Sequence, residues 1–405
     1  MLDDFGQRIR DIILSEMDLS RELSDEEICD LIGSVVSRET RDRPMTIKDR
    51  AELERTIFNS LRKLDVLQEL VDDRDVTEIM VNGPNDIFYE KAGRIQRFKG
   101  HFSSEDKLED VIQQIVGRHN RVVNQASPIV DTRLSDGSRV NIVLNPISIG
   151  GSAVSIRKFP EHPMSMERLV EIEALSPEVA RLLQILTQAK YNIFISGGTG
   201  SGKTTFLNAL SQYIPDDERI ITIEDSAELQ LLGAKNIVRL ETRNANTDGV
   251  TPITIRDLIR TALRMRPDRI IVGECRGAEA LDMLQAMNTG HDGSLSTGHA
   301  NSPHDIISRI ETMVLQGQDF PLNAIRQQIA SGIDIIVQLG RLRDKSRRVL
   351  EVSEVDGFMD GEIVLHTLYR FEETGVLDSG RIQGFLKKAG TLCHTDKLMA
   401  AGLSV

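Results

Sequence analysis

Residues 197–204 read Gly-Gly-Thr-Gly-Ser-Gly-Lys-Thr and directly follow the apolar stretch 193–195. A glycine, four residues and then Gly-Lys-Thr form the pattern of a phosphate-binding loop, whose backbone N–H groups surround the α- and β-phosphates of a nucleotide. The helix that follows such a loop adds its positive N-terminal end. The pattern predicts a nucleoside triphosphate site, and the alternative is a glycine-rich turn that binds nothing.

Each residue type in this run has a role in the predicted site. The Lys203 ammonium group is expected to reach the β- and γ-phosphates, and the Thr204 hydroxyl is expected to hold Mg²⁺. We therefore predict ATP and Mg²⁺ as ligands. The expected nucleotide contacts are Gly198, Thr199, Gly200, Ser201, Gly202, Lys203, Thr204 and Thr205.

Two carboxylates follow predicted strands of the same region. Glu224 ends the run 219–223, and Glu274 comes after the run 269–272. The carboxyl ends of parallel strands share one edge of a sheet, so both acids should lie beside the loop. We assign Glu274 to the Mg²⁺ shell and Glu224 to activation of the attacking water. The alternative for each is a carboxylate that caps a helix or pairs with Arg276 or Arg239.

Histidine and arginine supply further candidates. His299 follows the predicted strand 294–297, where a neutral imidazole could sense the γ-phosphate or serve only as a structural hydrogen bonder. The arginines 256, 260 and 264 recur every four residues on one predicted helix, which is more typical of a solvated or interface stripe than of a catalytic array.

Composition limits the class of protein. The 405 residues carry a net charge of -13 and no long basic block, which disfavours a purely electrostatic grip on nucleic acid. The cysteines Cys29, Cys275 and Cys393 lie far apart, so we expect no zinc and no disulfide framework. The apolar runs are too short or too charged to span a bilayer, so a cytoplasmic protein that meets a membrane only through a partner is expected.

The pattern of apolar residues and predicted secondary structure changes three times along the chain, which divides it into four predicted domains. Helical spacing at 1–67 predicts an N-terminal helical module, with a loop at 38–46. Short β-type runs and a helix at 104–119 predict an α/β domain at 68–160, and residues 160–163 form a linker. An ATPase core at 161–340 and a C-terminal β-rich extension at 341–405 complete the division.

Strands and helices alternate within the predicted core, which is typical of a mostly parallel sheet with crossover helices. The fold class is therefore α/β, with a P-loop core. The predicted strands are 192–195, 219–223, 237–240, 269–272 and 294–297, and the predicted helices begin at Lys203 or cover 255–265 and 278–287.

Together these motifs resemble the secretion ATPases of type II and type IV secretion and pilus systems, and most closely the CpaF/TadA-like branch that powers tight-adherence (Tad) pili. The resemblance runs from about Val71 through the core and more loosely beyond. Cys275 and Gly298 depart from the residues common in this family, and the tetracysteine zinc element of many of its members is missing here. The motifs that carry the resemblance are 77–83, the phosphate loop, 222–229, 264–274, 287–294 and 299–301.

The resemblance implies a RecA-like core preceded by a PAS-like α/β domain, in a homo-hexameric ring that works at an inner-membrane platform protein. It also implies that Arg133, Arg139 and Arg157 approach the phosphates from the second domain. Hydrolysis would then drive motion between the domains and power pilus assembly, retraction or secretion. The alternatives are a nucleotide-gated scaffold with little turnover and a nucleic-acid translocase on the same core, although the acidic charge makes nucleic acid an unlikely partner.

Overall fold

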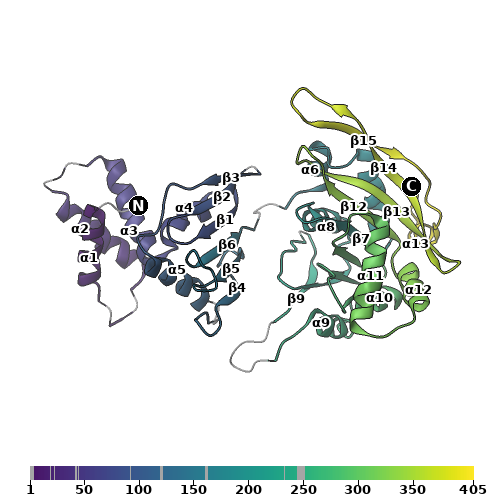
Figure 1. Cartoon of the computed structure of the whole chain (residues 1–405), viewed down its shortest axis with the longest axis horizontal. Helices are drawn as coiled ribbons and strands as arrows, with labels where there is room; N and C mark the ends of the chain where they lie inside the picture. Colours follow the sequence, from purple (N-terminus) through teal and green to yellow (C-terminus); the bar gives the residue numbers. More distant parts are fainter. Residues whose placement is uncertain are drawn as a thin grey trace. The chain divides into compact units, whose positions relative to one another are not determined.

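Figure 1 shows the fold of the chain in a computed structural model. The structure describes residues 4–405 except 19, 22, 42, 44, 92, 119–121, 160–162, 232 and 244–250. The chain forms two compact units, Met1–Glu161 and His162–Val405, and each is described by itself. The predicted linker at 160–163 falls at this division, but residues 160–162 lie outside the described part.

The first unit begins with a bundle of three helices. Ser24 and Thr46 cap α2 and α3 by accepting a backbone N–H from the third helical residue, which fixes where these helices start. Isoleucine and valine side chains fill the core of the bundle. The helices are α1 (Asp4–Glu16), α2 (Asp25–Glu39) and α3 (Ile47–Arg62).

An antiparallel sheet of six strands follows in the order β3-β2-β1-β6-β5-β4. Strands β4, β5 and β6 alternate buried residues with more exposed ones, and α5 packs its apolar face against the buried side. This confirms the predicted α/β character of the region. The elements are η1 (Asp65–Leu67), α4 (Gln68–Asp72), β1 (Val76–Asn82), β2 (Ile87–Lys91), β3 (Arg94–Arg97), α5 (Glu105–Gly117), β4 (Ile129–Arg133), β5 (Arg139–Val143) and β6 (Ala153–Arg157).

The second unit contains a mixed sheet of nine strands in the order β15-β14-β13-β12-β7-β11-β10-β8-β9. The six strands from β12 to β9 run parallel, and β13, β14 and β15 add an antiparallel meander. The strands are β7 (Ile193–Gly197), β8 (Arg219–Glu224), β9 (Asn236–Glu241), β10 (Arg269–Val272), β11 (Leu295–Gly298), β12 (Ile335–Arg341), β13 (Arg347–Met359), β14 (Glu362–Val376) and β15 (Ile382–Lys388).

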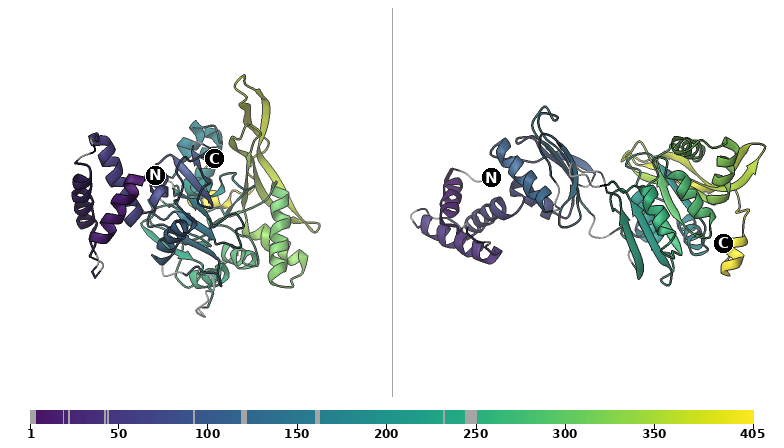
Figure 2. Two further views of the ribbon diagram at one scale, coloured as in Figure 1. Left: turned by 60° about the vertical axis from the view of Figure 1, so that its left-hand side comes forward. Right: turned by 90° about the horizontal axis from the view of Figure 1, so that it is seen from below.

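Helices cover both faces of this sheet (Figure 2). Helices α6, α7 and α8 share one apolar core with it, and α9 to α12 share the other. This arrangement confirms the predicted fold class. The helices are α6 (Met166–Glu171), α7 (Pro177–Gln188), α8 (Lys203–Ser211), α9 (Ile255–Ala262), α10 (Ala280–Asn288), α11 (Pro303–Gly317), α12 (Leu322–Gly332) and α13 (Asp396–Ala401).

The division of the chain into four domains stays a prediction. The expected boundary at 67/68 falls inside the first unit, and the one at 340/341 falls inside the second. Strand β12 ends at Arg341 and pairs with β13, so one sheet continues across residue 340.

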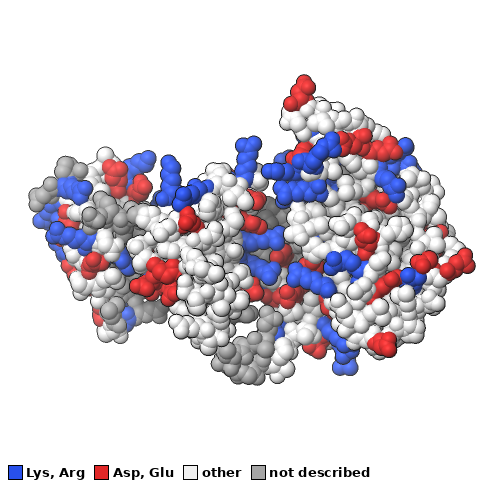
Figure 3. Space-filling view, in the orientation of Figure 1, with Lys and Arg blue, Asp and Glu red and all other residues white. Residues whose placement is uncertain are grey.

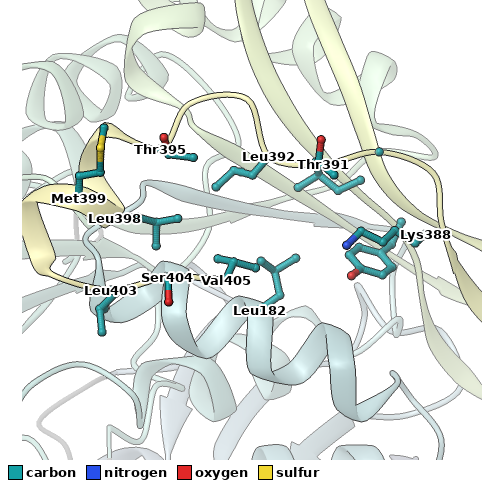
Figure 4. A pocket seen from close by; sticks show the side chains of 13 residues that line it. Leu182, Lys388, Thr391, Leu392, Thr395, Leu398, Met399, Leu403, Ser404 and Val405 are labelled. Atoms are coloured by element: carbon teal, nitrogen blue, oxygen red, sulfur yellow. The ribbon is translucent and has the colours of Figure 1, made fainter.

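Polar contacts hold the C-terminal segment, residues 389–405, against the rest of the second unit. The buried Glu354 carboxylate accepts the backbone N–H groups of Cys393 (2.7 Å) and His394 (2.8 Å). The Lys397 ammonium group bridges Asp334 (2.7 Å) and Asp292 (2.8 Å). Figure 4 shows the cavity of about 340 Å³ that this segment covers, with Leu182 of α7 on its opposite wall.

A buried ion pair in the second unit predicts a large effect on stability. The Arg269 guanidinium binds the Glu218 carboxylate and the carbonyl oxygens of Thr187 (2.8 Å) and Gly293 (3.1 Å). Arg269→Met leaves the acid buried without this partner, so we expect the free energy of unfolding in urea to fall by about 3–5 kcal/mol. The matched change Arg168→Met removes an exposed pair with Glu171 and should cost less than about 1 kcal/mol. Equal losses in both variants would contradict this account.

Candidate active site

The phosphate loop connects the buried strand β7 to helix α8. Gly200 (φ 71°) and Gly202 (φ 94°) adopt left-handed backbone conformations that residues with a Cβ rarely take. Lys203 is the first residue of α8, and Thr204 and Thr205 follow on its first turn, half-buried. The sequence therefore folds into the strand, loop and helix that the motif predicts, with the predicted contact residues on one continuous segment.

The Lys203 side chain is buried against its own loop. Its Nζ donates to the carbonyl oxygens of Gly197 (3.0 Å) and Gly198 (3.1 Å) and lies 3.3 Å from Nδ1 of His299. Burial lowers the pKa of Lys203; the Glu274 carboxylate acts in the opposite direction, and Arg276 adds to the lowering. The ammonium group is thus held by neutral oxygen and nitrogen acceptors that an anionic phosphate can replace.

His299 and Glu274 extend this contact into a chain of polar groups. Nε2 of His299 lies 2.7 Å from one Glu274 carboxylate oxygen, and Arg276 donates to the other at 2.7 Å. Burial and the Lys203 charge lower the pKa of His299, while Glu274 opposes them. A neutral imidazole presents Nδ1 as an acceptor to the Lys203 ammonium group, and its Nε2 lies in close contact with Glu274. Arg276 also reaches Asp225 at 3.7 Å.

Glu224 lies beside this chain in a buried position with 4% exposure. One carboxylate oxygen accepts the backbone N–H groups of Glu228 (2.7 Å) and Leu229 (2.9 Å), which fixes its orientation. Gly273 makes room for it, because a Cβ there would lie 2.8 Å from the Glu224 Cγ. One alternative from the sequence occurs, because Glu274 pairs with Arg276. The N–H groups that Glu224 accepts belong to a segment outside any helix, so Glu224 is not a helix cap.

A polar cavity of about 590 Å³ opens between the loop and helix α11. Thr199 and His299 line one side, and Asp305 and Arg309 line the other. Sequence reasoning missed these α11 residues. A usable signal was present, because Pro303 and the cap Ser302 start a helix directly after His299.

The three arginines expected from the first unit lie in one row of its sheet. Antiparallel pairing sets Arg133 opposite Arg139, and Arg139 opposite Arg157. Directly opposed residues share a face, and this face is the one turned away from α5. Weak ion pairs at 4.0 Å link Arg139 to Asp131 and Arg157 to Glu78. The structure thus brings the three arginines together, and their approach to the phosphates stays a prediction.

The four-residue arginine stripe is only partly solvated. Arg256 (2.8 Å) and Arg260 (3.0 Å) bind the two oxygens of Asp282, a buried carboxylate on α10. These two arginines therefore attach α9 to α10. The sequence interpretation as a solvated or interface stripe was incomplete, because the buried acid lies 22 residues further along the chain.

The two departures from the family pattern have packing explanations. Cys275 points into the core, where its sulfur lies 3.9 Å from that of Met313 and where burial raises the pKa of the thiol. At Gly298, a Cβ would lie 2.9 Å from Phe194 and 3.0 Å from Ile306. A larger residue at position 298 does not fit beside these neighbours without a shift.

A phosphate loop, two carboxylates and a neutral histidine at one edge of a mostly parallel sheet define a P-loop ATPase. The chain belongs to the type II/IV secretion system protein family, whose model matches residues 60–381. Within the part of the chain that the structure describes, we find no helix with the length and apolarity to cross a membrane. The described residues also hold no cluster of three or more potential metal ligands from His, Cys, Asp and Glu.

Named relatives agree with this family. The type IV secretion system protein PtlH of Bordetella pertussis is 33% identical over 320 residues, which cover 73% of this chain and 94% of PtlH. The conjugal transfer protein TrbB of Rhizobium radiobacter is 31% identical over 332 residues, which cover 81% of this chain and 98% of TrbB. The solved ATPase DotB of Legionella pneumophila has a similar fold, with a TM-score of 0.53, 22% identity and coverage of 72% of this chain and 80% of DotB.

The close fit of Gly273 against Glu224 generates a test of the site. In Gly273→Ala, the new methyl group must displace the buried carboxylate, so we expect the rate of ATP hydrolysis to fall at least tenfold while ADP binding stays within threefold. The control is Gly375→Ala, because no atom lies within 4 Å of the added Cβ at that position. Steady-state turnover and ADP titration measure the two quantities. Native turnover in Gly273→Ala would show that the position of Glu224 does not matter.

Proposed function

We propose that this protein is a hexameric ATPase motor that powers pilus assembly, pilus retraction or secretion through an inner-membrane platform. The observation that carries the proposal is the continuous contact from Lys203 through His299 to Glu274 at the phosphate loop. These three groups come from α8 and from the ends of β11 and β10. A change at the γ-phosphate can therefore alter three elements of the core together.

Hydrolysis needs an activated water and neutralised phosphate charge. Glu224 is our candidate for water activation, because its carboxylate is buried and oriented by two backbone N–H groups. The Thr204 hydroxyl and Glu274 fit Mg²⁺, which prefers oxygen ligands and takes one or two from protein beside those of substrate phosphates. When bound, Mg²⁺ would neutralise charge on the β- and γ-phosphates. Arg276 and His299 hold the Glu274 carboxylate ready for this role.

Coupling to motion is assigned to the arginine row of the first unit. Arg139 lies between Arg133 and Arg157 on one face of this sheet. Such a row of guanidinium groups suits an anion that presents several acceptor oxygens. We propose that the phosphates supply that anion, so that hydrolysis changes how the two units are held together.

The cellular role follows from the family and from the relatives. PtlH and TrbB carry names from type IV secretion and conjugal transfer. We keep the CpaF/TadA-like assignment to tight-adherence pili as our proposal, supported by the motifs and by three scattered cysteines in place of a tetracysteine element. A cytoplasmic ring that reaches the inner membrane through its platform partner fits this role. An acidic net charge of -13 speaks against a nucleic-acid translocase.

Hydrolysis measured across protein concentration tests the motor. We expect Mg²⁺-dependent ATP turnover to rise as light scattering detects a six-subunit mass, to survive nuclease treatment and to stop in EDTA. Glu224→Gln keeps an oxygen for the backbone N–H groups, so ATP binding should persist while turnover falls at least 100-fold. Lys203→Ala removes the phosphate contact and should lose ATP binding.

Two results would contradict the motor. Native protein that binds ATP in a ring but never turns it over favours the nucleotide-gated scaffold. Cells that carry Lys203→Ala and still show normal pilus or secretion output would exclude a role for hydrolysis in either process.

A further inference from the structure

The turn between β12 and β13 lies at the same edge of the sheet as the phosphate loop. Strand β12 runs parallel to β7 with Leu339 beside Gly197, so its last residue, Arg341, reaches that edge. A Cβ on Gly197 would lie 2.7 Å from the Leu339 carbonyl oxygen, which shows how closely the two strands approach there. The turn is closed by the Leu342 N–H, which donates to the Ser346 carbonyl oxygen at 2.8 Å, and by the Lys345 N–H, which donates to the Leu342 carbonyl oxygen at 2.9 Å. Figure 3 shows basic and acidic side chains interspersed on the viewed face of the second unit.

Two arginines stand directly opposite each other at the base of this turn. Arg341 of β12 pairs with Arg347 of β13, and both side chains are exposed. Opposed residues of an antiparallel pair share a face, and like charges in that position destabilise the pair. Arg343 in the same turn binds the Glu373 carboxylate. A positive charge with a structural role in this turn is therefore paired with a negative one. The Arg341–Arg347 repulsion is a cost that an anionic ligand would offset.

Arg347 already contacts the phosphate loop. Its Nε donates to the Gly200 carbonyl oxygen at 2.8 Å. A guanidinium group carries five N–H donors, and one neutral carbonyl oxygen does not neutralise its charge. Arg347 therefore lies against the loop, and its guanidinium group has further N–H donors besides the one that binds the Gly200 carbonyl oxygen.

The order of the strands decides which end of the nucleotide this pair would meet. Glu274 and His299 mark the γ-phosphate side, and they follow β10 and β11. Strands β12 and β13 lie on the other side of β7. A nucleotide whose γ-phosphate faces Glu274 therefore extends its α-phosphate toward the β12–β13 turn.

We propose that Arg341 and Arg347 form a second anion contact that holds the α-phosphate end of the nucleotide bound at the phosphate loop. The proposal rests on the proposed function, because it requires a nucleotide at that loop. It gives the meander after β12 a direct part in nucleotide binding. It also explains why a chain of net charge -13 keeps two opposed arginines at this position.

ADP titration of the intact chain tests the contact. We expect Arg341→Gln and Arg347→Gln each to weaken ADP binding about tenfold and to make it less sensitive to salt. The matched control is Lys345→Gln, which removes the same charge from an exposed position in the same turn and should stay within twofold of native. Equal affinity in the native chain and both arginine variants would overturn the proposal, and so would an equal loss in Lys345→Gln.

Thermal unfolding without nucleotide separates binding from structure. Arg341→Gln removes a like-charge neighbour, so its unfolding temperature should equal or exceed the native value. A lower temperature would show that Arg341 serves the fold and would overturn the proposal. A changed assembly mass with native ADP affinity would assign the turn to a contact between copies and would overturn it as well.

ADP binding by the native chain and by Lys203→Ala distinguishes a failure of the proposed function from a failure of the Arg341–Arg347 contact. If native protein does not bind ADP, the proposed function fails together with this contact. If native protein binds ADP, Lys203→Ala does not, and both arginine variants bind like native, only the contact of Arg341 and Arg347 fails.

Discussion

The contacts of one buried ammonium group determine how the site is built. Lys203 is held by two carbonyl oxygens of its own loop and by Nδ1 of His299, and no carboxylate oxygen is among these three acceptors. A buried cation with neutral partners is a costly arrangement, as its lowered pKa reflects. Phosphate oxygens are stronger acceptors for an ammonium group. A phosphate would therefore be a favourable partner for Lys203, and His299 links the Lys203 contact to Glu274.

The sequence predicts which residues meet at this edge of the sheet because the signals are local. The phosphate loop, Glu274 and His299 each come after a strand, Glu224 is the last residue of one, and parallel strands end at a common edge. What the sequence could not supply is the choice among partners. Both acids had a structural alternative, and only the structure shows that Glu224 binds two backbone N–H groups while Arg276 and His299 share Glu274. The fit of Gly273 against Glu224 also depends on two strands whose residues are far apart in the chain.

The fold was predictable where a pattern repeats and not where pairing is long-range. Alternating strands and helices predict the parallel core, whereas the sequence pattern does not identify α6, α7, α11, α12 or β12. Strand β12 joins the core to the β13–β15 meander in one sheet. The rows formed by Arg133, Arg139 and Arg157 and by Arg341 and Arg347 depend on strand register, which residue spacing alone does not determine.

The central claim is that Lys203 exchanges its loop carbonyls and His299 for a nucleotide phosphate. The most direct measurement is a high-resolution structure of Glu224→Gln with Mg²⁺ and ATP. The account predicts that Nζ of Lys203 lies within hydrogen-bond distance of the β- and γ-phosphates and no longer contacts Nδ1 of His299. A bound nucleotide with Lys203 still on the carbonyl oxygens of Gly197 and Gly198, or a nucleotide away from this loop, would contradict it.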